Sequence, residues 1–256
     1  MLSKNKIRFI RSLEMKKFRS ESGCFLAEGN RLVGDILPLF ECELLLARPS
    51  WLATQGDIRA GELIVAEGDD LERASLLKTP QDVLAVFRQR EMYPDTENFR
   101  NELVIVLDGI QDPGNLGATV RIADWFGISN VVCSHDSADI YNPKTVQATM
   151  GAIARVTVSY ADLPELLDKI GDDLPVYGTF LSGENIYREN LTENGLIVMG
   201  SEGNGISPAI EQRISHRLYI PSYPADAETV ESLNVASATA IICSEFRRRI
   251  AARDYI

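Results

Sequence analysis

The chain is poor in the residues that hold metals, form disulfides or cross membranes. Among 256 residues there are two histidines, and the four cysteines, Cys24, Cys42, Cys133 and Cys243, are scattered without a C-x-x-C pair. This pattern argues against a zinc site and favours reduced thiols. No apolar run approaches the ~20 residues that span a bilayer, and the basic N-terminus lacks the apolar stretch of a signal peptide. We therefore expect a cytoplasmic protein with no metal and no membrane partner.

The composition is otherwise that of an ordinary folded protein. Hydrophobic residues make up 45% and charged residues 25%, which argues against disorder, a collagen-like chain or a coiled coil. The net charge of −11 is uneven, since the part through Arg100 carries −1 and the remainder −10. Residues 1–20 hold seven basic side chains against Glu14 alone, and more arginines lie at 247–253. Such basic ends permit phosphate contacts, but solvated helix faces explain them equally well, so charge leaves the partner open.

The first hundred residues read as a small α/β unit. Hydrophobic periodicity predicts helices over residues 4–18 and 30–40, and strands over 25–27, 43–47, 63–66 and 83–87. The polar stretch 90–100 contains Pro94 and follows neither period, so it is the best candidate for a linker. We accordingly predict two domains, 1–97 and 98–256.

In the second part, short apolar runs alternate with helical patterns. The runs predict strands over 103–107, 131–133, 154–158, 176–180, 196–200 and 218–220, and helices over 116–126, 163–170 and 235–251. Fully apolar strands separated by helices indicate an α/β fold with a mostly parallel sheet covered on both faces. Ligands of such sheets bind in the loops beyond the carboxyl ends of the strands.

The first of three unusual loops joins a strand to a helix between residues 108 and 121. Gly114 and Gly117 bracket Asn115, and Arg121 lies in the second turn of the predicted helix. Because helical side chains lean toward the N-terminus, Arg121 can reach back toward Asn115. The alternative is that Asn115 only caps the helix and Arg121 forms a surface salt bridge.

The other two loops follow later strands. A predicted buried strand ends in a loop with three glycines, Gly200, Gly203 and Gly205, where a flat ligand could approach the backbone. A plain tight turn would also explain these glycines, but it would not explain why a glutamate, Glu202, stands among them. Ser232 and Asn234 then flank Leu233 before the final helix, which one of the two polar residues would cap.

Together the loops resemble the three signature motifs of the SpoU (TrmH-like) family of RNA 2′-O-methyltransferases, in the SPOUT superfamily. The matching motifs are N-L-G-x-x-x-R from Asn115, V-M-G-S-E-G-x-G from Val198, Y-I-P from Tyr219 and S-L-N-V from Ser232. The resemblance covers residues 103–249. It implies an α/β fold with a C-terminal trefoil knot and a homodimer. More loosely, F-L-A-E-G-N-R from Phe25 resembles the small ribosomal-protein-like domain with which many members bind RNA.

Carried over position by position, the resemblance assigns the site residues. The catalytic and substrate-binding set would be Asn115, Arg121, Glu202, Ser232 and Asn234, and the S-adenosylmethionine contacts would be Thr179, Gly200, Ile220 and Leu233. In this family the arginine is proposed to accept the hydroxyl proton. Guanidinium is normally always charged, so stabilising the developing alkoxide and gripping an RNA phosphate is an equally good role for Arg121.

One stretch departs from the family pattern. Ten residues, 222–231, separate Ile220-Pro221 from Ser232, which is longer than the usual link, and Ser222 stands where methionine is common. Acidic residues at 226, 228 and 231 add negative charge there. The departure concerns the rim of the cofactor pocket and the substrate preference more than the chemistry.

The sequence therefore predicts a methyltransferase that modifies a ribose 2′-hydroxyl, in ribosomal RNA rather than transfer RNA because of the extra N-terminal domain. The alternative is a catalytically silent RNA-binding or ribosome-assembly protein that retains the fold, although the complete motif set argues against it. A nucleotide-binding oxidoreductase ranks third, because G-x-G-x-x-G does not follow the first strand of the sheet.

Overall fold

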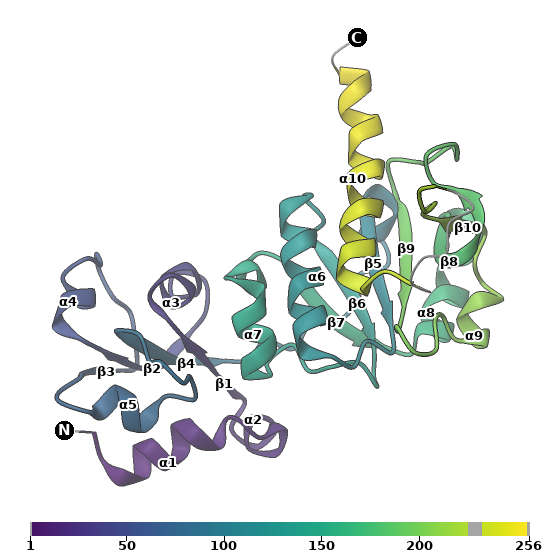
Figure 1. The fold of residues 1–256 in the computed structure, drawn as a ribbon. Helices are drawn as coiled ribbons and strands as arrows, with labels where there is room; N and C mark the ends of the chain where they lie inside the picture. Colours follow the sequence, from purple (N-terminus) through teal and green to yellow (C-terminus); the bar gives the residue numbers. More distant parts are fainter. Residues whose placement is uncertain (1, 225–231, 255–256) are drawn as a thin grey trace. The chain divides into compact units, whose positions relative to one another are not determined.

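The computed structural model describes residues 2–224 and 232–254, and it divides into two compact units (Figure 1). The first holds the described residues up to Glu91 together with Asp139–Arg155, and the second holds Met92–Ala138 and the described residues from Val156 onward. No helix in the described ranges is both long enough and apolar enough to span a membrane.

The first unit is built on a mixed four-stranded sheet in the order β1-β4-β2-β3. Strand β4 is antiparallel to both of its neighbours, whereas β2 and β3 are parallel. The strands are β1 (Cys24–Glu28), β2 (Cys42–Ala47), β3 (Glu62–Val65) and β4 (Val83–Arg88). Its helices are α1 (Lys4–Ser12), α2 (Lys16–Ser22), α3 (Asn30–Ile36), α4 (Pro49–Leu52), α5 (Asp70–Ala74), α7 (Pro143–Thr149) and the 3-10 helix η2 (Ala152–Ala154).

The single helix expected over residues 4–18 is wrong, because α1 ends at Ser12 and α2 begins at Lys16. The Arg19 side chain, only 2% exposed, explains the break. Its Nη1 donates to the carbonyl oxygens of Leu13 and Glu14 at 2.9 and 2.7 Å, which satisfies backbone acceptors that a helix end leaves unpaired. Hydrophobic periodicity carries no information about this contact.

The segment Asp139–Arg155 packs in the first unit although it lies between two strands of the second in the chain. Asp139 Oδ2 accepts hydrogen bonds from Arg19 Nε at 3.1 Å and Nη2 at 2.6 Å. The Tyr141 ring lies 4.8 Å from that of Phe25, centroid to centroid, and α7 packs against β1. This segment supplies part of the cover of the first sheet.

The second unit has a six-stranded, entirely parallel sheet in the order β10-β8-β9-β5-β6-β7. Its strands are β5 (Leu103–Asp108), β6 (Asn130–Ser134), β7 (Thr157–Ala161), β8 (Val176–Asn185), β9 (Gly195–Gly200) and β10 (His216–Tyr219). The predicted α/β class with a parallel sheet is confirmed. Strand β7 begins at Thr157, three residues later than the predicted start at 154, because Ala152–Ala154 forms η2. Strand β8 extends beyond the predicted 176–180.

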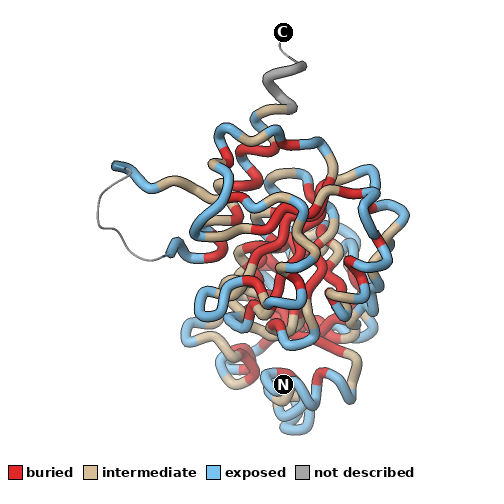
Figure 2. The backbone as a smooth tube through the Cα atoms, turned by 90° about the vertical axis from the view of Figure 1, so that its right-hand side faces the viewer, coloured by how far each residue is buried: buried red, intermediate tan, exposed pale blue. Residues whose placement is uncertain are grey.

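Helices cover both faces of this sheet. They are α6 (Pro113–Trp125), α8 (Leu163–Ile170), α9 (Pro208–Glu211) and α10 (Val235–Asp254), with the 3-10 helices η1 (Asn98–Asn101) and η3 (Gly171–Asp173). The core under α8 contains Val104 and Val106, whereas Ile105, which must point to the opposite face, is also fully buried. Helices α6 and α10 lie side by side (Figure 1). Strands β5 and β9 are buried along nearly their whole length, and Figure 2 shows the buried residues gathered in the interior with exposed residues at the outer turns.

The structure tests the predicted linker but not the predicted effect of residues 222–231 or the knot. The expected linker 90–100 is not wholly a linker, since Phe99 of η1 is fully buried in the core of the second unit. The acidic residues at 226, 228 and 231, which we expect to affect the rim of the cofactor pocket, lie outside the described residues. The trefoil knot stays a prediction.

Candidate active site

Asn115 lies in the first turn of α6, where β5 hands the chain over to the helix. Asp112 is the N-cap residue, because its Oδ1 accepts a hydrogen bond from the Asn115 backbone N–H at 2.9 Å, and Pro113 follows it at the first helical position. The alternative that Asn115 itself caps the helix is therefore wrong. Its side chain is left for other partners.

Three predicted residues from three distant loops meet in one hydrogen-bonded triangle, which we call the Asn115–Glu202–Asn234 triangle. Asn115 Nδ2 donates to Glu202 Oε1 at 2.8 Å. Asn234 Nδ2 donates to the same oxygen at 2.9 Å and to Asn115 Oδ1 at 2.9 Å. Residues that are 87 and 119 positions apart in the chain are thus in direct contact. The sequence motifs predict this convergence.

The N-terminus of α10 supports the triangle. Asn234 Oδ1 accepts from the backbone N–H groups of Ala236 and Ser237 at 3.1 and 3.3 Å, so Asn234, and not Ser232, caps the helix. The Val235 N–H also donates to Glu202 Oε1 at 3.3 Å. Because a helix N-terminus carries a partial positive charge, it stabilises the carboxylate of Glu202 in place.

The glycine loop that carries Glu202 is held by a close backbone approach. A Cβ atom at Gly200 would lie 2.1 Å from the backbone carbon of Gly205, so only glycine fits there. Ser201 and Gly205 exchange backbone hydrogen bonds of 3.1 and 2.8 Å, and Gly205 has a positive φ of +67°. This tight turn fixes the direction in which Glu202 leaves the end of β9.

The remaining predicted residues form no hydrogen bond with the triangle in the described ranges. Thr179 Oγ1 donates to the Val198 carbonyl at 3.1 Å, Ile220 is half-buried, and Leu233 is exposed. Arg121 and Ser232 are both exposed, and the hydrogen bonds of residues 2–224 and 232–254 place neither in the triangle. Arg121 lies six positions after Asn115 on α6, about 9 Å farther along the helix axis. The role of Arg121 at this site stays a prediction.

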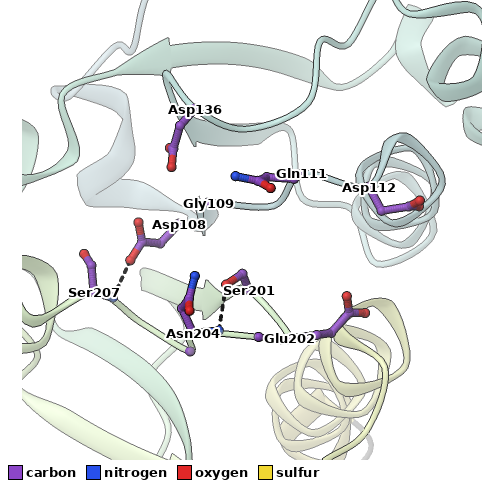
Figure 3. A pocket seen from close by; sticks show the side chains of 11 residues that line it. Asp108, Gly109, Gln111, Asp112, Asp136, Ser201, Glu202, Asn204 and Ser207 are labelled. Carbon is purple, nitrogen blue, oxygen red and sulfur yellow. Dashed lines mark hydrogen bonds between the residues drawn. The ribbon is translucent and has the colours of Figure 1, made fainter.

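Glu202, a member of the triangle, also lines a polar cavity of about 280 Å³, whose lining side chains are drawn in Figure 3. Of the predicted site residues only Glu202 lines it. Asp108 at the end of β5 accepts from the Ser207 N–H at 2.6 Å, which ties the glycine loop to the central strand. The sequence motifs did not mark Asp136, which reaches the cavity from the loop after β6. Its position after a strand of a parallel sheet was the available signal.

No group of three or more His, Cys, Asp or Glu side chains suited to a metal ion occurs in the described part of the chain. All four cysteines are free and buried. Burial raises the pKa of the Cys42 and Cys243 thiols to about 12. Thiols with so high a pKa remain protonated at neutral pH, which makes them poor nucleophiles.

Comparison with known proteins identifies the family of the chain. Residues 102–244 match the model of the SpoU rRNA Methylase family, and residues 4–85 match the MRM3-like substrate binding domain. The chain is 31% identical over 247 residues to the Bacillus subtilis 23S rRNA (guanosine(2553)-2′-O)-methyltransferase RlmP, covering 94% of this chain and 96% of that protein.

Solved structures give the same result. A TrmH-family RNA methyltransferase structure from Porphyromonas gingivalis superposes with a TM-score of 0.88 at 42% identity, covering 97% of this chain and 99% of the other. An AdoMet-bound rRNA methyltransferase from Sinorhizobium meliloti superposes with a TM-score of 0.80 at 27% identity, covering 98% and 97%. The chain thus belongs to the SpoU rRNA methylase family, which confirms the family predicted from its three motifs.

Proposed function

We propose that this protein transfers a methyl group from S-adenosylmethionine to the ribose 2′-hydroxyl of a guanosine in 23S rRNA. Methylation of rRNA with this cofactor is the activity of its family. The choice of guanosine and of 23S rRNA is supported by the name of the Bacillus subtilis relative, which matches nearly the whole chain. The observation that carries the proposal is the Asn115–Glu202–Asn234 triangle, since a catalytically silent relative has no chemical need for it.

The residues predicted to contact S-adenosylmethionine are compatible with it. The backbones of Ile220 and Leu233 lie outside helix and strand, so their polar groups can pair with a ligand. The exposed Leu233 side chain and the half-buried Ile220 side chain offer apolar surface to a ligand. When bound, the cofactor's sulfonium supplies an already activated methyl group, so the protein has to bind and orient rather than activate.

Hydrogen-bond counting shows what the triangle offers to a ribose. Both N–H groups of the Asn234 amide are used, one on Asn115 and one on Glu202. The Asn115 amide uses one N–H on Glu202 and keeps the second. Glu202 receives all of these bonds on Oε1, which leaves Oε2 as an acceptor. One donor and one acceptor side by side suit a hydroxyl, which both accepts and donates, and they orient it for attack on the methyl carbon.

Arg121 would then act on the RNA backbone rather than through the triangle. It is exposed on α6, and a planar guanidinium grips a phosphate with two parallel hydrogen bonds. A cation held there stabilises the developing alkoxide without becoming neutral. This role needs the forked geometry of arginine, which the point charge of lysine cannot reproduce.

The first unit supplies an RNA-binding surface on α1, α2 and the turn between them. Phe9, Met15 and Phe18 are 37%, 56% and 38% exposed there, and Arg8 and Lys16 are exposed among them. Basic side chains attract phosphates, and exposed aromatic rings stack on unpaired bases, which is how single-stranded RNA loops are generally bound. The match of this region to a substrate binding domain supports the same role.

We also infer a homodimer and a cytoplasmic location. Trp125, at the C-terminal end of α6, is 84% exposed, and the N-terminal half of the neighbouring α10 presents Ser237 and the half-buried Ala238 and Ala240, small residues over which another helix can pack closely. Exposed aromatic side chains are enriched at protein interfaces, and small side chains allow two helices to approach closely. A substrate in ribosomal RNA and four free thiols are consistent with the cytoplasm.

The test is methyl transfer from labelled S-adenosylmethionine to 23S rRNA and to bulk tRNA, each isolated from cells lacking the enzyme, followed by mapping of the modified ribose. We expect label on one ribose of 23S rRNA. Arg121→Lys should lower transfer at least tenfold while calorimetric binding of S-adenosylmethionine stays unchanged, and the exposed Arg188→Lys should keep full activity as a matched control. Label on protein or on base nitrogens would refute the reaction, and full activity of Arg121→Lys would refute the role given to Arg121.

A further inference from the structure

The polar cavity beside the triangle has the size of one heterocyclic ring system. Its volume of about 280 Å³ lies just below the ~300 Å³ at which pockets for whole small-molecule ligands begin. It is formed by the loop after β5, the glycine loop after β9, and Asp136 after β6. Because Glu202 belongs both to the cavity wall and to the triangle, whatever fills the cavity lies next to the reacting ribose.

Gly203 indicates that the space is kept open for a ligand. A Cβ atom there would meet no protein atom within 4 Å, and the backbone of Gly203 does not have a positive φ. Neither packing nor backbone conformation therefore requires glycine, in contrast to Gly200. Gly203 lines the cavity, so a side chain there would project beside the space that a flat ring would occupy.

The polar groups around the cavity form a specific combination. Figure 3 shows the Asp136 carboxylate and the Gln111 and Asn204 amides directed toward the same space from three loops. Asp136 Oδ1 accepts one hydrogen bond, from Ser134 Oγ at 2.5 Å, and an ionised carboxylate has about four acceptor positions. The cavity thus presents an anionic acceptor pair opposite amide groups that can donate.

Guanine complements this combination better than the other three bases. Its Watson–Crick edge carries two adjacent donors, N1–H and the N2 amino group, which a carboxylate can accept together, and O6, which can accept from an amide. Adenine and cytosine place a ring-nitrogen acceptor where guanine has N1–H, which a carboxylate repels. Uracil has one ring N–H between two carbonyls. The match requires no protonation of Asp136.

We propose that this cavity binds the guanine base of the target nucleotide and that Asp136 is the residue that selects guanine. The inference rests on the proposed function, and it adds recognition of the base to recognition of the ribose. Gly203 leaves room for the ring, Asp136 accepts from N1–H and N2–H, and Gln111 or Asn204 donates to O6. The ribose of the same nucleotide then reaches the Asn115–Glu202–Asn234 triangle across Glu202.

The test uses synthetic RNA hairpins that carry the mapped nucleotide as guanosine or as inosine, which lacks only the N2 amino group. For the wild-type protein we expect kcat/KM to be about tenfold lower on the inosine hairpin, the range of one lost base contact. Asp136→Asn should lower kcat/KM on the guanosine hairpin at least tenfold and abolish the difference between the two hairpins. Asp172→Asn, an exposed carboxylate that does not line the cavity, should leave both values unchanged.

A second pair of variants tests the space itself. Gly203→Ala should raise KM for the guanosine hairpin about tenfold with an unchanged melting temperature, because no protein atom obstructs the added methyl. Gly56→Ala, where a Cβ also meets nothing within 4 Å, is the matched control. An unchanged guanosine-to-inosine ratio in Asp136→Asn, or a wild-type KM for Gly203→Ala, would overturn the proposal while methyl transfer by the wild-type protein still stands. Absence of any ribose methylation would refute the proposed function itself, and this inference with it.

Discussion

Arg19 in the first unit and Glu202 in the second unit each lie at the centre of a network of hydrogen bonds, and the two networks are built differently. In the first unit Arg19 is 2% exposed and donates to Asp139, Leu13 and Glu14. In the second unit Glu202 is exposed and accepts three hydrogen bonds on one oxygen only. A buried network with its donors engaged stabilises the fold, whereas an exposed one that retains a donor and an acceptor can bind a substrate.

The largest expected effect comes from breaking the buried network. Arg19→Met keeps an apolar stem but leaves Asp139, whose side chain is 19% exposed, and two carbonyls without their donor. We expect the free energy of unfolding to fall by about 3 kcal/mol, the lower end of the cost of breaking a buried pair, since Asp139 keeps some water contact. Urea denaturation measures it. Arg31→Met, at an 81% exposed arginine, is the control, and equal stability of the two variants would refute the distinction between the networks.

A somewhat smaller effect, on activity instead of stability, is expected from the exposed network. Glu202→Gln keeps the acceptor for Asn115, Asn234 and the Val235 N–H but puts an amide N–H₂ where the free carboxylate oxygen was. We expect methyl transfer to fall about 100-fold, as when one group aimed at the transition state is lost, and the free energy of unfolding to change by less than about 1 kcal/mol. Glu184→Gln, also exposed, is the control. A variant that loses stability as much as activity would make Glu202 structural.

The smallest expected effect is a pH dependence of stability that comes from the buried carboxyl group of Glu28. Burial raises the pKa of Glu28, opposed by hydrogen bonds from Ser75 and the Leu76 N–H. A carboxyl whose pKa is higher in the folded than in the unfolded state stabilises the fold below its unfolded pKa of about 4.3, and this contribution is lost as the pH rises through the folded value. Relative to Glu28→Gln, the wild type should therefore lose stability from pH 4 to pH 7, which urea denaturation at several pH values measures. Parallel stability–pH curves for the two proteins would contradict it.

The parts of the molecule that the sequence predicts are those encoded locally. Apolar runs and glycine motifs locate the parallel sheet, and the motifs predict that Asn115, Glu202 and Asn234 lie close together, as their hydrogen bonds show. The break after Ser12 could not be predicted, because its cause is a hydrogen bond from Arg19 to carbonyls several residues earlier. Asp136 was missed for a similar reason, since it reaches the cavity from a loop that has no motif of its own.

The excursion of the chain between β6 and β7 limits how this protein can be divided. Residues 139–155 lie within the sequence of the methyltransferase part, yet Val146, fully buried, belongs to the packing of the other unit. A shortened chain beginning at Met92 would expose this apolar segment to water, and one ending at Glu91 would leave Arg19 without its carboxylate. A transplant or truncation of either part therefore has to keep residues 139–155 with the first unit, although they are encoded between two strands of the second.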